Sequence, residues 1–205
     1  YTAGVLPHAG MDVRGGPNFN AGYRGRLDLE NLRRYVTGGG TLVVTKGAAV
    51  VVAEDPVLGA GVDVAGWAEH TSGPSLRTEW VEAMRPASPV MPWRPGLDEV
   101  GLPMLAAGYG RPEFASPGVY PVLLDVDETA GARVVARYST QAERLVLDGF
   151  MLEEDWPTLS GRAFAVVQRA GQGRVVYFAD EPTFRGFWYG LNTLFLNALL
   201  FGSVL

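Results

Sequence analysis

Cysteine is missing from the 205 residues of this sequence. Its absence excludes a thiol nucleophile, a disulfide framework and cysteine-ligated metal sites. Lysine is nearly missing as well. Lys46 is the only lysine among the 17 lysine and arginine residues. The two histidines, His8 and His70, are isolated, and neither has a second ligand at metal-binding spacing. We therefore expect no metal site and no cofactor in this chain.

Long apolar runs and basic clusters are also absent. No segment reaches the roughly 20 apolar residues that cross a bilayer, so we expect no transmembrane segment, and we find no signal peptide. A net charge of -5 argues against a nucleic-acid partner, since phosphate binding requires clustered cations. A hydrophobic content of 47% is enough to form a sizeable core.

The first quarter of the chain has the element order of an α/β domain. Residues 2–6 are strand-like, and Asp28 is a plausible cap for a helix that ends at Gly38–Gly40. A continuous apolar strand is expected at 41–45 and a short helix at 48–53. This order predicts a parallel βαβ unit. We expect one α/β domain over residues 1–205, with a mostly parallel sheet flanked by helices.

The last third of the chain predicts an antiparallel hairpin and a helix. Two apolar runs, 163–167 and 174–179, are separated by a glycine-rich turn. A polar turn at 180–183 ends the second run, and apolar residues then recur at helical spacing over 187–199. Earlier, eight of the fourteen prolines fall within 86–121, which predicts an irregular excursion or short strands.

Asp180 and Glu181 are the strongest candidates for acid–base chemistry. They follow a predicted strand at its carboxyl end, where α/β proteins often place their active sites. Arg185 is close in sequence, and His8 follows the end of the first predicted strand. These four residues are the candidate catalytic set. The structural alternative is a helix cap and an ion pair that order the turn.

Two other features give weaker signals. The acidic runs at 125–128 and 153–155 lie in turn-like stretches, where carboxylates are ordinarily solvated. The turn after the strand at 41–45 has no serine or cysteine, which a nucleophile elbow requires. Thr45 or Lys46 could be recruited there, but neither has an evident base beside it in the sequence.

Several sequence blocks resemble a known domain family. Their order is similar to that of the class I glutamine amidotransferase-like domain that follows the catalytic domain in some bacterial zinc carboxypeptidase-like proteins. The blocks that carry the resemblance are Leu32–Val44, Val134–Tyr138, Gly149–Leu152, Leu159–Ala163, Gly173–Phe178, Phe184–Gly186 and Leu194–Leu199.

The resemblance implies a flavodoxin-like fold without its catalytic residues. In the family, a cysteine stands at the elbow and a His-Pro-Glu motif follows a late strand. Here Gly47-Ala48 is near the elbow and Asp180-Glu181-Pro182 is near the second motif, so the resemblance implies a pseudoenzyme. It also implies that the first strands of the fold, upstream of Val5, are lacking. The family's zinc ligands belong to its other domain, and no residue here matches them.

Three functions follow from these observations. The first is a non-catalytic accessory domain that contacts an upstream catalytic domain, a larger assembly or a second copy of itself. The resemblance implies a periplasmic or secreted location for it. The second is a scaffold subunit, suggested by the abrupt start and by aromatic residues such as Trp93, Tyr109, Phe114 and Tyr120. The third is a hydrolase that uses the carboxylates at the strand ends.

Overall fold

The computed structural model describes residues 4–5, 29–68, 72–81, 101–184 and 188–205. These residues form an α/β fold in which helices flank a mixed sheet of ten strands. The strands are β1 (Gly4–Val5), β2 (Thr41–Thr45), β3 (Val62–Trp67), β4 (Ser72–Trp80), β5 (Glu113–Val119), β6 (Val122–Val126), β7 (Ala132–Tyr138), β8 (Val146–Asp148), β9 (Ala163–Ala170) and β10 (Gly173–Phe178). The α-helices are α1 (Leu29–Thr37), α2 (Lys46–Ala53), α3 (Trp156–Leu159) and α4 (Tyr189–Leu200). Short 3-10 helices are η2 (Leu102–Ala106), η3 (Glu128–Ala130), η4 (Ala142–Arg144), η5 (Glu153–Asp155) and η7 (Gly202–Val204).

The sheet is mostly antiparallel, so the prediction of a mostly parallel sheet is wrong, although the predicted parallel unit of β1, α1 and β2 is confirmed. Its main order is β1-β2-β10-β9-β7-β4-β5, with β6 joined to β9 and β3, and β8 joined to β4. Only the β1/β2 and β2/β10 pairs are parallel among the strands described. Parallel neighbours need long crossovers, usually helical. Between β3 and β10, the only α-helix in the described residues is α3, which has four residues.

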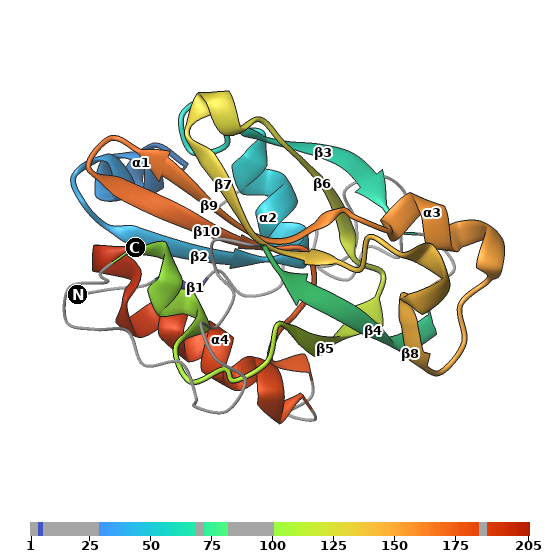
Figure 1. The fold of residues 1–205 in the computed structure, drawn as a ribbon. Coiled ribbons are helices and arrows are strands. Elements are labelled where there is room, and N and C mark those ends of the chain that lie inside the picture. The colour runs from blue at the N-terminus through green and yellow to red at the C-terminus, as the bar shows by residue number, and fades with distance from the viewer. Residues whose placement is uncertain (1–3, 6–28, 69–71, 82–100, 185–187) are drawn as a thin grey trace.

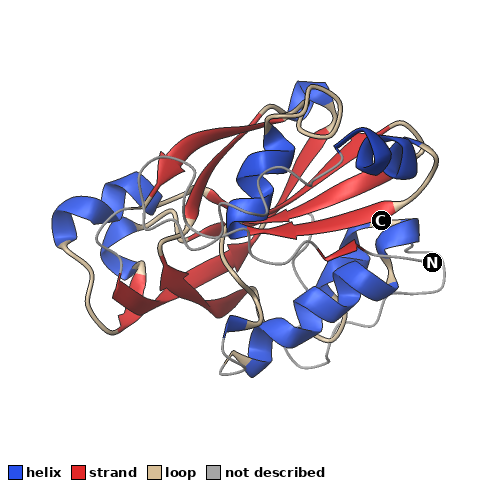
Figure 2. Ribbon diagram, turned by 180° about the vertical axis from the view of Figure 1, so that it is seen from behind, coloured by secondary structure: helices blue, strands red, loops and turns tan. Residues whose placement is uncertain are grey.

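Strand β2 lies in the middle of the layered part of the fold, and its predicted position is confirmed. All five of its residues are buried. Helices α1 and α2 lie on one side of β2 and β10, and α4 lies on the other side (Figure 1). Figure 2 shows the same layers from behind. A strand covered on both faces needs apolar side chains on both, which explains the continuous apolar run.

The β9–β10 hairpin is also confirmed. Ala170 pairs with Gly173 across a two-residue turn. Gly171 in this turn has a φ of 62°, a conformation that favours glycine. A Cβ atom at Gly171 would lie 2.8 Å from the carbonyl oxygen of Thr37, so the turn also packs closely against the end of α1.

Helix α4 confirms the helix predicted at the C-terminal end. Its inward side buries Leu191, Leu194 and Ala198. The side chain of Asn197 is buried as well, and its Nδ2 donates hydrogen bonds to the carbonyl oxygens of Leu105 and Ala107. These bonds satisfy a buried amide and fix α4 against η2. No helix in the described part of the chain is long and apolar enough to cross a membrane.

A chain of aromatic rings runs through the core from the proline-rich region. Residues 86–100 of that region lie outside the described part, but residues 101–121 form η2 and β5. Tyr109 and Phe114 are half-buried and pack with Trp80, at ring-centroid distances of 5.0 and 4.9 Å. Phe114 continues the contact to Phe164. These two aromatic residues, which suggested an exposed binding surface, are therefore largely core residues.

Candidate functional site: a buried ion pair at the strand ends

The strand-to-helix turn after β2 has a strained backbone. Thr45 ends the strand and Lys46 begins α2, with no loop residue between them. Lys46 has a φ of 48°, which lies in the left-handed region that side chains with a Cβ atom rarely adopt. Such a conformation costs about 1–2 kcal/mol. A sharp, strained strand-to-helix turn is the geometry of a nucleophile elbow, and here that position holds the only lysine of the chain.

Asp180 lies beside this lysine. Strands β2 and β10 are parallel neighbours, and Thr45 is in register with Phe178. Their carboxyl ends therefore meet at one edge of the sheet, and Asp180 follows β10 by two residues. The Nζ atom of Lys46 lies 3.3 Å from Oδ1 of Asp180, and the side chains are 4% and 0% exposed, respectively. The sequence offered no carboxylate near Lys46; the tertiary structure supplies one.

The carboxylate of Asp180 also binds two backbone amides. Its Oδ2 accepts a hydrogen bond of 2.9 Å from the N–H of Val119, and its Oδ1 accepts one of 2.8 Å from the N–H of Glu181. Burial raises the pKa of Asp180 to about 6, although the charge of Lys46 and the two amides oppose this rise. Every oxygen of the carboxylate therefore has a protein partner.

The backbone just beyond Val119 is strained as well. Tyr120, in the turn between β5 and β6, has a φ of 51° and is 40% exposed. Among the described residues, Lys46 and Tyr120 are the only non-glycine residues with positive φ. One contacts Asp180 through its side chain, and the other follows the residue whose amide Asp180 binds. Strained residues tend to gather at functional or switching sites.

Tyr138 adds a buried hydroxyl to this region. It lies at the end of β7 with no exposed surface, and its hydroxyl has no hydrogen-bond partner among the described residues. Burial, together with the negative charge of Asp180, raises the pKa of Tyr138 well above its usual value. The phenol therefore stays neutral and contributes no charge to the site.

Of the four predicted candidates, the structure places Asp180 and Glu181 in this site. Glu181 contributes its backbone N–H to the carboxylate of Asp180. Arg185 and His8 lie outside the described residues. The predicted set missed Lys46 as the partner of Asp180, and it missed Tyr138. The available signal was a single lysine within an otherwise apolar run, since a buried cation needs an anionic partner.

A second group of carboxylates lines an open hollow of about 510 Å³ at another place in the fold. Its acidic residues are Glu54, Asp55, Asp63, Asp125 and Asp127. Asp55 is held by Arg33 at 2.6 Å, and Asp125 pairs with Arg162. Asp127 accepts hydrogen bonds from Thr129. No group of three His, Asp or Glu residues in the described part of the chain is arranged to hold a metal ion.

Comparisons with known proteins give similarities of fold. Neither a family model nor a curated protein matches the chain. A β-galactosidase from Bacillus circulans sp. alkalophilus is similar over 81% of this chain and 20% of its own, with 15% identity and a TM-score of 0.45. A cytoplasmic protein from Salmonella typhimurium LT2 is similar over 83% of this chain and 58% of its own, with 15% identity and a TM-score of 0.49. A ThuA-like protein from Bacteroides uniformis is similar over 84% of this chain and 62% of its own, with 14% identity and a TM-score of 0.45.

These comparisons correct the family expected from the sequence. None of the three is described as a carboxypeptidase, and the predicted relation to zinc carboxypeptidase-like proteins is therefore wrong. The chain spans between 20% and 62% of the length of these solved chains. Identities of 14–15% concern the fold alone, and no residue role is transferred from them.

Proposed function

We propose that this chain is a non-catalytic α/β domain, with an amidotransferase-like layout in which a buried ion pair fills the catalytic positions. The contact between Lys46 and Asp180 is the observation that carries the proposal. Lys46 occupies the strained turn after β2, directly before Gly47-Ala48, which lie near the position of the elbow cysteine in class I amidotransferases. Asp180 follows β10, where the family places its catalytic histidine. Both positions are thus used for a structural contact.

The chemistry of the pair supports this proposal. An activated nucleophile must reach its substrate and be deprotonated by a neighbouring base. Lys46 is 4% exposed, and an ammonium in an ion pair has no lone pair with which to attack. Asp180 is 0% exposed, and both of its oxygens already accept hydrogen bonds from backbone amides. A hydrolase based on Asp180 would need this carboxylate to be accessible to water and substrate, and it is fully buried.

Enzymatic assays test the proposal. We expect the purified chain to release no ammonia from glutamine and to hydrolyse no p-nitrophenyl esters or glycosides above the rate in buffer. The variants Asp180→Asn and Glu181→Gln are the matched controls. Turnover that is lost in both variants would instead establish a hydrolase with carboxylates at the strand ends. Turnover of any other kind would also refute the proposal.

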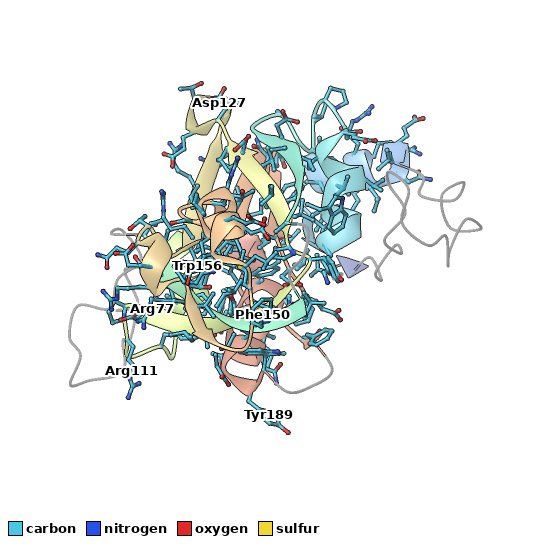
Figure 3. All side chains as sticks on the ribbon, turned by 90° about the vertical axis from the view of Figure 1, so that its right-hand side faces the viewer. Arg77, Arg111, Asp127, Phe150, Trp156 and Tyr189 are labelled. Carbon is cyan, nitrogen blue, oxygen red and sulfur yellow. The ribbon has the colours of Figure 1, made fainter. Side chains whose placement is uncertain are left out.

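The outer face of α4 favours a second, compatible role as an assembly surface. Tyr189, Leu196 and Leu200 are 78%, 51% and 63% exposed, and Thr193 between them is exposed as well. Figure 3 shows Tyr189 projecting away from the body of the molecule. These positions are spaced by four, three and four residues, which is the spacing of a helix–helix seam. A row of exposed apolar side chains along one helix face is a candidate contact surface.

A second copy of this chain is the proposed partner for that face. Helix α4 has no charged residue among its twelve. Two copies with a net charge of -5 repel each other, and an uncharged apolar stripe is a surface through which they can meet without opposing charges in contact. A two-fold axis would place each stripe against an identical one.

Light scattering after size exclusion tests this role. We expect a dimer whose fraction rises with concentration, and we expect Leu196→Glu to convert it to a folded monomer whose melting temperature no longer depends on concentration. The matched control is Leu147→Glu, at a 42% exposed leucine on β8. A chain that is monomeric at all concentrations, or a dimer that Leu196→Glu leaves intact, contradicts the proposal.

A further inference from the structure

Asp180 connects the two strained points of the described backbone. Its Oδ1 contacts Lys46, the strained residue after β2, and its Oδ2 binds the amide of Val119, next to the strained Tyr120. The two points belong to different parts of the sheet, since β2 lies beside β1 and β10 whereas β5 lies at the far end of the main strand order. One buried carboxylate is thus shared by both.

We infer that Asp180 couples the exposed β5–β6 turn to the buried elbow, so that the two open and close as one conformational unit. The turn is the outer part of this device, because Tyr120 is 40% exposed. The elbow is the inner part, because Lys46 is 4% exposed. A contact that displaces Tyr120 from outside would thereby uncover the only lysine of the chain. This inference goes beyond the lack of catalysis and does not depend on it.

The physical reason for the coupling is the burial of the shared carboxylate. If the Val119 amide leaves, the buried carboxylate of Asp180 has one donor fewer, and either protonation of the carboxylate or its exit toward water then weakens the ion pair with Lys46. Lys46 then loses its counter-charge, and its strained backbone is free to relax. The same structural changes can also begin at Lys46 and end at Tyr120. Elements with two alternative arrangements transmit a local structural change to a distant site in this way.

The alternative is that the β5–β6 turn and the elbow move independently, although both contact Asp180. In that case, relief of strain at Tyr120 would change the turn and leave the elbow as it was. The experiment must therefore perturb one end and measure the other.

The single lysine makes such a measurement possible. Acylation of Lys46 by an N-hydroxysuccinimide ester, followed by peptide mass spectrometry, reports its exposure without overlap from other side-chain amines. Hydrogen exchange at the amides of Val119 and Tyr120 reports the turn. We expect Asp180→Asn to accelerate both the acylation and the exchange, each by about tenfold or more, because it removes the charged acceptor. The matched control is Asp125→Asn, at a partly exposed ion pair, which should change neither.

A second variant keeps the test valid if Asp180→Asn does not fold. Tyr120→Gly removes the strain of a positive φ without touching Asp180. We expect Lys46 to be acylated severalfold more slowly in Tyr120→Gly than in the matched variant Tyr120→Ala, because both lose the ring and its contacts and only alanine keeps the Cβ atom at a positive φ. Equal Lys46 rates in Tyr120→Gly and Tyr120→Ala overturn the coupling, as does an Asp180→Asn variant in which only one of the two sites responds.

Discussion

Replacing Lys46 by methionine tests the energetics of the buried pair most directly. The change keeps the length of the side chain and removes the charge that lies 3.3 Å from Asp180. Breaking one side of a buried ion pair often costs about 3–5 kcal/mol, because the other charge is left uncompensated. Here we expect a smaller cost that depends on pH, because Asp180 can escape the penalty by taking up a proton.

The magnitude follows from the pKa of Asp180. Burial raises it from 3.8 to about 6. A group with a higher pKa in the folded state stabilises the fold fully below its unfolded value, and this contribution is lost as the pH rises through about 6. At pH 7, about one unit above this pKa, ionisation of Asp180 in the folded chain still contributes on the order of 1 kcal/mol. Without Lys46, burial raises the pKa further and this gain disappears.

Lys46→Met should therefore lower the free energy of unfolding by on the order of 1 kcal/mol at pH 7, by more at pH 8 and by little at pH 5. Urea unfolding followed by tryptophan fluorescence at the three pH values measures this, with an unchanged m-value as the sign of an unchanged unfolded state. The control Arg162→Met removes the partner of the exposed Asp125 and should cost at most about 0.5 kcal/mol without a pH trend. A loss at pH 5 equal to that at pH 7 would refute the reasoning.

Three further changes probe the fold around the site. Asp55→Asn weakens the contact of a nearly buried carboxylate with Arg33, and we expect a loss of about 1–3 kcal/mol in urea unfolding at pH 7. Gly171→Ala forces a Cβ atom to within 2.8 Å of the Thr37 carbonyl at a φ of 62°, so the melting temperature should fall by several degrees, a loss of about 1–2 kcal/mol. Tyr177→Phe removes a hydroxyl that donates a 2.9 Å hydrogen bond to a buried carbonyl, and calorimetry should show a loss of about 1 kcal/mol. A neutral result in any of the three contradicts the contact concerned.

Features set by neighbouring residues were predictable from the sequence. The apolar run of β2, the β9–β10 hairpin and α4 all lie where the pattern placed them, because each depends on residues within one turn or one strand. The candidate Asp180 was also found by such reasoning, since it follows an apolar strand directly.

Features set by the pairing of distant segments were not predictable. The runs that form β7 and β9 are apolar enough for either strand direction, and their antiparallel pairing depends on the whole path of the chain. The positive φ of Tyr120 has no signal in its own residue type, because it results from the turn between β5 and β6.

The sequence by itself determined that this chain has no thiol, only one lysine, and an apolar strand that is followed, after Lys46, by a short helix. It also determined that an acidic residue follows the last strand. Only the tertiary structure decided that these two charges meet. The parallel register of β2 with β10 brings Thr45 beside Phe178, and that register depends on contacts between segments far apart along the chain. Their burial then makes the pairing of the two charges necessary, since neither charge is stable alone in an apolar interior.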